Sequence, residues 1–390
     1  MLNVNLNKSK SVPNSWQFQE KRLTLHPQNT PLFMMSDLEI FARRLKQARI
    51  LKKLSMEQLC SKMEIDITKQ AISKYESAKM MPSSTILVAM AEALEVELDY
   101  FFRPFTIDID KLQVSFRKKS DASAKDVSAM KIQIMDDIER YLEIEEILGK
   151  EPVILSRPES SPITNAEQMR ECARKVRQNW ALGNDAIANV QDILEEHGIK
   201  VILTEASNSF DGVSGIVNGK HHVIVLNKNQ EHVERRRFTA LHELGHLLYN
   251  DCFADSLSAR EREILCDNFA NEMLVPSSTI AASFKSGDKI STSELKAFQT
   301  AYGISISALM VKIHQLQIMS DSRYKSYCIR VRSDEHLREF VEKSRYRENL
   351  VNRFETMVYS AAAKDMISTS KAASLLRCPI TRVRKNLNIV

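Results

Sequence analysis

Residues 235–249 read RRRFTALHELGHLLY, and their apolar positions recur at the three- and four-residue steps of a helix. His242 and His246 are four residues apart, so on a helix they lie one above the other, as two ligands of a tetrahedral zinc ion require. Glu243 stands beside them, where a carboxylate acts as a general base. The apolar flanks indicate a buried helix, in which two His and a Glu without partners would be costly. The pattern therefore predicts a zinc-dependent peptidase site rather than a chance pair of surface His.

A third ligand is expected further along the chain. Residues 258–276 read SAREREILCDNFANEMLVP, which predicts a second amphipathic helix that ends at Pro276. Glu263 and Asp267 share one face of that helix, because they are four residues apart. This spacing suits a carboxylate that binds zinc and a second one that holds the other ring nitrogen of a ligand His. We expect Glu263 in the first role and Asp267 in the second, with Glu261 and Glu272 as surface charges. Water would take the fourth position, which is the open geometry of a catalytic zinc site.

The segments FTALHELGH (238–246) and DNFANEMLVP (267–276) resemble the ImmA/IrrE family of metallopeptidases. The resemblance covers about residues 165–320. Known members are gluzincin-like and cut helix-turn-helix repressors. The resemblance implies an α+β zinc endopeptidase domain with a small sheet, in which Zn²⁺ is held by His242, His246 and Glu263. The family usually has an Ala-Asn or Cys-Asn step after the ligand Glu, whereas this chain has Cys266-Asp267, whose side chain can still hydrogen-bond a ligand His.

The sequence before the zinc helix predicts strands. Residues 199–205 alternate as a strand, and residues 213–217 and 220–226 flank Asn218-Gly219, which is typical of a hairpin with a type I′ turn. An edge strand beside the zinc helix would let an extended peptide add to the sheet. We expect His221 and His222 to be exposed polar residues rather than ligands, because neighbours on a strand point to opposite faces.

The N-terminal part of the chain predicts five short helices, at residues 37–53, 55–63, 68–76, 85–94 and 97–102. The segment AISKYESAKMMPS (71–83) resembles the XRE (Cro-type) helix-turn-helix domain, although Met56 stands where that family commonly has a Gln, and the turn at 64–67 is longer than usual. In that domain the second helix of the motif enters the major groove. Carried onto this chain, the residues that contact DNA are Lys69, Gln70, Ser73 and Lys74, with Arg43 and Arg44 on the basic first helix. The alternative is a protein-interaction module with a solvated basic face.

The length of 390 residues agrees with a chain of two or three domains. Its net charge is mildly basic, at +5. Residues 36–80 hold ten Lys/Arg against six Asp/Glu, which suits one DNA-binding module. The six Cys contain no C-x-x-C pair and are expected to be reduced, as in a cytoplasmic protein. No apolar run is long enough to span a bilayer, and the start lacks the pattern of a signal peptide.

These patterns divide a mainly α-helical chain into five parts. They are a disordered leader (1–34), the XRE domain (35–104), a linker with a long helix at 124–148 (105–163), the ImmA/IrrE-like domain (164–320) and a helical C-terminal region (321–390). In the last part, helices are expected at 349–364, 368–376 and 380–387. The apolar stripe of the long helix could pack on the peptidase domain or pair with a second copy. A homodimer is expected, because readers of this type commonly bind paired half-sites.

The combined prediction is a cytoplasmic DNA-binding regulator that carries a zinc metalloendopeptidase. Its expected partners are a double-stranded DNA operator and a protein substrate, either a separate repressor or its own segment near residues 103–125. The alternative is a transcription factor or antitoxin that does not cut, whose metal domain binds a signal or a toxin-like partner. A metallo-amidase for small molecules is weaker, because no small-molecule pocket signature is present.

Overall fold

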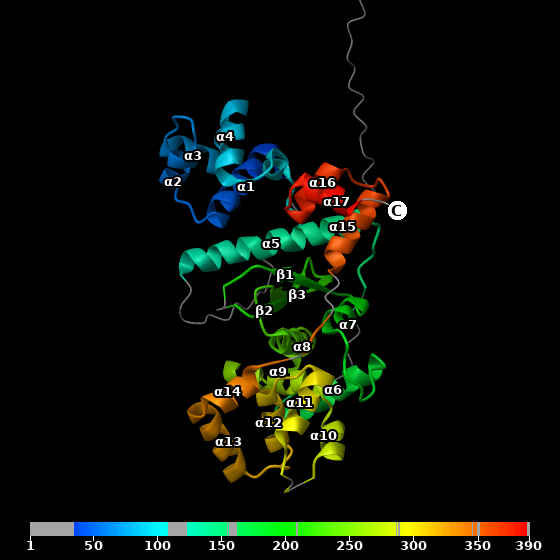
Figure 1. Ribbon diagram of the computed structural model, residues 1–390. Coiled ribbons are helices and arrows are strands. Elements are labelled where there is room, and N and C mark those ends of the chain that lie inside the picture. The colour runs from blue at the N-terminus through cyan, green and yellow to red at the C-terminus, as the bar shows by residue number, and fades with distance from the viewer. Residues whose placement is uncertain are drawn as a thin grey trace, which may run out of the picture.

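The structure is a computed structural model that describes residues 35–107, 123–153, 155, 162–207, 210–285, 287, 289–344, 346–348 and 352–387. It is mainly helical with one small sheet, which confirms the predicted fold class (Figure 1). The predicted disordered leader, residues 1–34, lies outside the described residues. Within the described part of the chain, no helix is both long and apolar enough to cross a membrane.

Side-chain caps set the starts of the N-terminal helices. Ser36, Ser55, Thr68 and Ser83 each accept a hydrogen bond from a backbone N–H in the first turn of the next helix, where the donors have no intrahelical partner. The elements that follow are α1 Asp37–Leu51, α2 Met56–Lys62, α3 Lys69–Glu76, α4 Ser84–Leu94 and the 3₁₀ helix η1 Leu98–Phe102. They enclose a small core that includes Phe41, Leu59, Ile72, Met90 and Phe101. Five helical elements are confirmed, the fifth being a 3₁₀ helix.

The sheet has three strands, β1 Ile199–Thr204, β2 Gly212–Val217 and β3 His221–Asn227. β3 is central, and it pairs parallel with β1 and antiparallel with β2. Asn218 and Gly219 in the β2–β3 turn have φ values of 51° and 69°, and a type I′ turn requires both to be positive. The predicted strands and hairpin are confirmed, and β2 is an edge strand.

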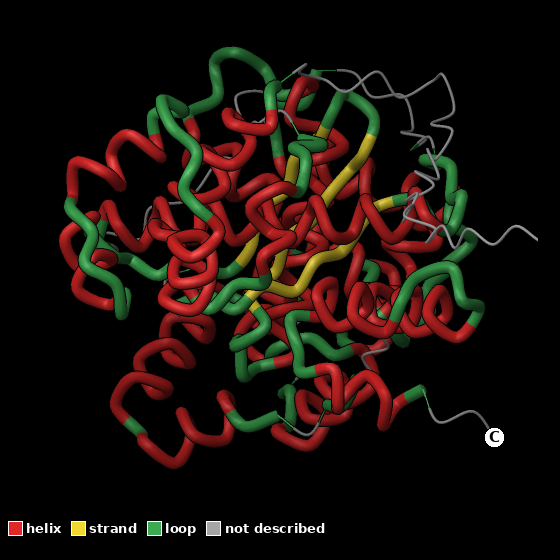
Figure 2. The backbone as a smooth tube through the Cα atoms, turned by 90° about the horizontal axis from the view of Figure 1, so that it is seen from above, coloured by secondary structure: helices red, strands yellow, loops and turns green. Residues whose placement is uncertain are grey.

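The two faces of the sheet pack on different helices. Val201 and Leu226 belong to the same buried cluster as the apolar side of α8, Val233–Tyr249. Val213 faces the other way and packs with α5, Ala124–Ile147. Figure 1 shows α5 and α8 on opposite sides of the strands, and Figure 2 shows the strands surrounded by helices. The long helix predicted as part of a linker is therefore a layer of the fold, and its apolar stripe packs on its own chain.

Beyond α8 lies a helical layer that completes the larger domain. It contains α6 Ala166–Asn179, α7 Val190–Glu196, η3 Asn250–Cys252, α9 Ala259–Leu274, α10 Ser277–Ser283, α11 Thr292–Tyr302, α12 Ile306–Gln315, α13 Asp321–Ser333 and α14 Glu335–Glu342. Gly245 lets α8 and α9 approach closely, since a Cβ there would lie 3.3 Å from the Phe269 ring and 3.4 Å from the Cys266 sulfur. The buried cluster continues past the predicted boundary at residue 320, because Val341 belongs to it.

The C-terminal region forms three helices, α15 Arg353–Ala363, α16 Thr369–Leu376 and α17 Ile380–Asn386. All three expected helices are present, and residues 349–351 and 388–390 lie outside the described part of the chain. Val358, Leu375 and Val383 join the buried cluster that α5 forms with the sheet. The region therefore caps α5 on the side away from the strands (Figure 1).

A buried network of ion pairs connects the N-terminal domain, α5 and the C-terminal helices. Arg44 of α1 lies 2.8 Å from Glu139 of α5, and it donates to two main-chain carbonyls at 2.9 and 2.8 Å. Arg103 pairs with the same Glu139 at 3.2 Å and also with Asp136. From the other end of the chain, Arg377 pairs with Asp136 as well. Mutual pairing of this kind offsets the cost of removing the charges from water.

Candidate metal centre and DNA-binding face

Three predicted ligands converge where α8 meets α9. The Nε2 atoms of His242 and His246 are 3.1 Å apart. The two carboxylate oxygens of Glu263 on α9 face these nitrogens, with Oε2 3.3 Å from Nε2 of His242 and Oε1 3.3 Å from Nε2 of His246. Two nitrogen ligands of one tetrahedral zinc ion lie about 3.4 Å apart, given Zn–N distances of about 2.0–2.1 Å. The donor set, two imidazole nitrogens and a carboxylate oxygen within 4.8 Å of one another, therefore fits a zinc ion.

Asp267 orients one of these ligands. Its Oδ1 lies 2.7 Å from Nδ1 of His242, so the other ring nitrogen, Nε2, points toward Glu263. A carboxylate behind a ligand His fixes the tautomer and the direction of the ring. The structure thus brings together Glu263 and Asp267 as the spacing on their helix predicts.

The other two acidic residues of α9 have structural contacts. Glu261 is exposed and closes a capping box with Ser258, in agreement with its prediction as a surface charge. The prediction that Glu272 is a surface charge is wrong, because its side chain is 0% exposed. Its carboxylate lies 2.7 Å from Lys312 Nζ and accepts hydrogen bonds from Ser277. This pair ties α9 to α12 and compensates two buried charges.

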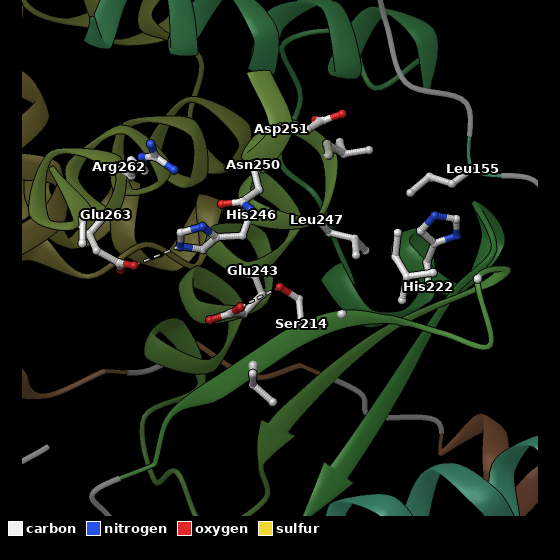
Figure 3. A pocket seen from close by; sticks show the side chains of 16 residues that line it. Leu155, Ser214, His222, Glu243, His246, Leu247, Asn250, Asp251, Arg262 and Glu263 are labelled. Carbon is white, nitrogen blue, oxygen red and sulfur yellow. Dashed lines mark hydrogen bonds and ion pairs between the residues drawn. The ribbon is translucent and has the colours of Figure 1, made fainter. Parts of the chain in front are cut away.

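Glu243 contacts the sheet. Its Oε2 accepts a hydrogen bond of 2.8 Å from the Ser214 hydroxyl on β2 (Figure 3). Ser214 was not among the residues that the sequence pattern singled out. The only sequence signal for it is the alternation of β2, which turns Val213 toward α5 and Ser214 toward α8. The hydroxyl fixes the direction of the carboxylate that stands next to the three ligands.

A pocket of about 1010 Å³ opens beside these residues. Its walls come from β2, α8 and α9, and they include Ser214, Glu243, His246 and Glu263 (Figure 3). Because β2 is an edge strand of the sheet, one row of its backbone groups borders this space without a neighbouring strand among the residues that the structure describes.

His221 and His222 are half-buried, so their prediction as exposed residues is wrong. Burial lowers the pKa of His221 to about 4, and it also lowers the pKa of His222. His222 lines the far part of the pocket in Figure 3. Neither residue belongs to the cluster of possible ligands that the described residues form.

The predicted DNA-contacting residues of α3 share one exposed face. Lys69, Gln70, Ser73 and Lys74 are all exposed, whereas Ile72 and Tyr75 on the opposite face are buried in the domain core. Lys69 forms an ion pair with Glu57 of α2. The face is therefore polar and open to a duplex.

The two arginines predicted as DNA contacts on α1 have different environments. Arg43 is exposed. The prediction that Arg44 contacts DNA is wrong, because its side chain is 1% exposed and is paired with Glu139 of α5. The sequence pattern does not reveal this partner, which comes from a different layer of the fold.

Two family profiles match parts of the chain. The helix-turn-helix family matches residues 45–101, which contain α2, α3 and α4. The IrrE N-terminal-like domain matches residues 194–314, which contain the sheet, α8 and α9. No curated protein sequence matches the chain significantly. The chain thus joins an XRE-type helix-turn-helix DNA-binding domain to a peptidase-like domain of the ImmA/IrrE family.

Proposed function

We propose that the chain is a transcription regulator whose ImmA/IrrE domain is a zinc-dependent endopeptidase that cleaves a regulatory protein. The observation that carries the proposal is the meeting of His242, His246 and Glu263 next to Glu243 at the wall of an open pocket. A site that only stabilised the fold would have four protein ligands and no access to solvent, whereas catalytic zinc sites keep three ligands and an open position.

Each residue has a role in the proposed reaction. His242, His246 and Glu263 would hold the ion, and Asp267 keeps His242 in the orientation that ligation needs. A zinc ion held there supplies a Lewis acid for the scissile carbonyl and lowers the pKa of water. Glu243 takes the proton of the attacking water and passes it to the leaving amine.

In this proposal, β2 orients the substrate along the edge of the sheet. An extended segment of a protein can hydrogen-bond to the free edge of β2 and place one peptide bond near Glu243. Ser214 on the same strand holds the Glu243 carboxylate beside that peptide bond. A repressor is one proposed substrate. The chain's own segment near residues 103–125 is the other, and most of it, residues 108–122, lies outside the described residues.

The N-terminal domain brings this activity to DNA. In the proposal Lys69, Gln70, Ser73 and Lys74 face the major groove, and Arg43 contacts a phosphate. Gln pairs with adenine through two hydrogen bonds, and Lys binds guanine or a phosphate. We expect a homodimer on paired half-sites of an operator, in the cytoplasm where the operator is found.

Zinc content tests the metal centre first. Protein purified without added zinc should carry about one zinc per chain, and both His242→Ala and Glu263→Gln should lose it. Glu261→Gln is the matched control, because this exposed carboxylate lies on the same helix outside the cluster. Wild-type protein without zinc would contradict the proposal.

Cleavage is tested with Glu243→Gln, which keeps the three ligands and removes the base. Wild-type protein should cut a repressor substrate or itself, and the variant should not, while both bind zinc and DNA equally. The alternative function is a regulator that binds a signal or a toxin-like partner without cutting it. If regulation of the target operator persists in the Glu243→Gln variant, that alternative replaces the proteolytic one.

A further inference from the structure

The last two helices that the structure describes are connected by the kind of short turn that a helix-turn-helix has. α16 ends at Leu376, and Arg377 has a φ of 47° in the left-handed region. Its N–H donates to Ser374, and the next N–H donates to Ala373, so the chain turns sharply. Pro379 then precedes α17 directly. Two helices joined by a turn of about three residues are the defining part of a helix-turn-helix.

The connection from α15 to α16 resembles the connection from α1 to α2 in the N-terminal domain. α15 is followed by Asp365 with a φ of 54°, and Ser368 then caps α16. In the N-terminal domain, α1 is followed by Lys53 with a φ of 56°, and Ser55 then caps α2. Both ends of the chain therefore use a left-handed residue and a Ser cap to lead into the first helix of the pair.

The sequence of α16 and α17 is strongly basic. From residue 366 to the last residue the chain has five Lys/Arg and no Asp/Glu. Arg377 pairs with Asp136, and Lys371 pairs with Glu143, so these two are engaged with α5. The remaining three basic residues all lie on α17: Arg382, Arg384 and Lys385.

These three side chains are open to solvent. α17 packs through Val383, its one buried residue, and all three basic residues are exposed. The guanidinium of Arg382 lies 3.9 Å from the carboxylate of Glu355. Because this ion pair is long and exposed to solvent, it is weak, and Arg382 can still bind another anion. Arg384 and Lys385 form no ion pair with any residue that the structure describes. A positively charged surface of this kind attracts a polyanion.

The last two helices lie on the same side of α5 as the N-terminal domain. Figure 1 shows α16 and α17 on the side of α5 that carries α1 to α4, whereas α8 and α9 lie on the other side of the sheet. We propose that α15–α17 form a second DNA-contacting unit, in which Arg382, Arg384 and Lys385 bind phosphates of duplex DNA. The inference rests on DNA binding by the N-terminal domain and not on peptidase activity.

The test is the salt dependence of binding to a labelled random-sequence duplex of about 40 base pairs, because each lost phosphate contact lowers the slope of log K against log salt by about 0.9. The full-length triple variant Arg382→Gln, Arg384→Gln, Lys385→Gln should lower the slope by up to about 2.7, and Lys385→Gln alone by about 0.9. Unchanged melting temperatures establish that the variants are folded.

The matched control removes the same charge from an exposed helix on the opposite side of the sheet. Lys325, Arg330 and Arg332 of α13 are exposed, and their triple change to Gln should leave the slope unchanged. An unchanged slope in the α17 variants, or an equal fall in the α13 variant, overturns the inference. A wild-type protein that binds no duplex overturns both this inference and DNA binding by α3, whereas loss of binding in a Lys69→Gln, Lys74→Gln variant alone concerns only α3.

Discussion

Replacing Arg44 with Ala tests whether this residue stabilises the junction with α5 or contacts DNA. Its guanidinium pairs with Glu139 at 2.8 Å and lies 3.9 Å from the centre of the Phe105 ring. Removing one partner of a buried ion pair costs about 3–5 kcal/mol. Glu139 keeps Arg103 as a partner at 3.2 Å, so we expect the lower end of this range, about 3 kcal/mol.

The neighbouring residue is the matched control. Arg43→Ala removes the same charge from an exposed position on the same helix, and we expect it to change stability by less than about 0.5 kcal/mol. If Arg43 contacts a phosphate, its loss lowers the salt slope of DNA binding by about 0.9. Arg44→Ala should leave that slope unchanged, because the side chain does not reach the surface.

Native-state hydrogen exchange of the α1 amides measures the stability, since a chain of several domains has no single free energy of unfolding. DNA titrations at several salt concentrations measure the slope. The expected pattern is faster α1 exchange with an unchanged slope for Arg44→Ala. A lower slope with unchanged exchange would refute the assignment of Arg44 to the buried network.

Three further changes test other parts of the structure. Asp267→Asn should weaken zinc binding about 10–100-fold, because the carboxylate orients a ligand His, and equal affinity in competition with a chelator would contradict this role. Glu195→Gln should stabilise the surroundings of α7 by roughly 2–3 kcal/mol near pH 8 and by almost nothing near pH 4, as measured by native-state hydrogen exchange of the α7 amides. Burial raises the pKa of Glu195 from 4.5 to about 7, so stability falls as the pH rises between these values, and an equal gain at both pH values would disprove the cause. Glu272→Gln should cost about 3–5 kcal/mol because it leaves Lys312 buried without its charge partner, whereas Glu261→Gln should cost under about 1 kcal/mol, and equal melting temperatures for the two would rule this out.

Local signals in the sequence predict the elements well. Ser55 and Thr68 mark the starts of α2 and α3, and Asn218-Gly219 marks the hairpin, because caps and turns depend on residues that are adjacent in the chain. The spacing of Glu263 and Asp267 predicts that they share a face for the same reason. How these residues function in the metal centre stays a prediction until the metal is measured.

Long-range partners cannot be predicted in this way. Arg44 looks like a DNA contact because it belongs to a basic helix, and only the packing of α1 on α5 brings Glu139 to it. Glu272 looks like a surface charge, and only the position of α12 brings Lys312 to it. Charged side chains are mostly exposed, so a single sequence favours the surface for both. The pairing that overrides this preference is a property of the tertiary fold.

The same packing explains how one chain holds a DNA-binding face and a pocket in a fixed relation. α5 buries Ile138 against the sheet, in the same cluster as Val213 of β2, and its Glu139 pairs with Arg44 of the N-terminal domain. β2 continues directly from Val213 to Ser214, which holds Glu243. Contact of this kind fixes one arrangement and does not by itself couple the two sites, because coupling needs a second arrangement that a ligand prefers. A mutation that breaks the buried pairs on α5 therefore weakens the junction with the N-terminal domain without removing any group from the candidate metal centre.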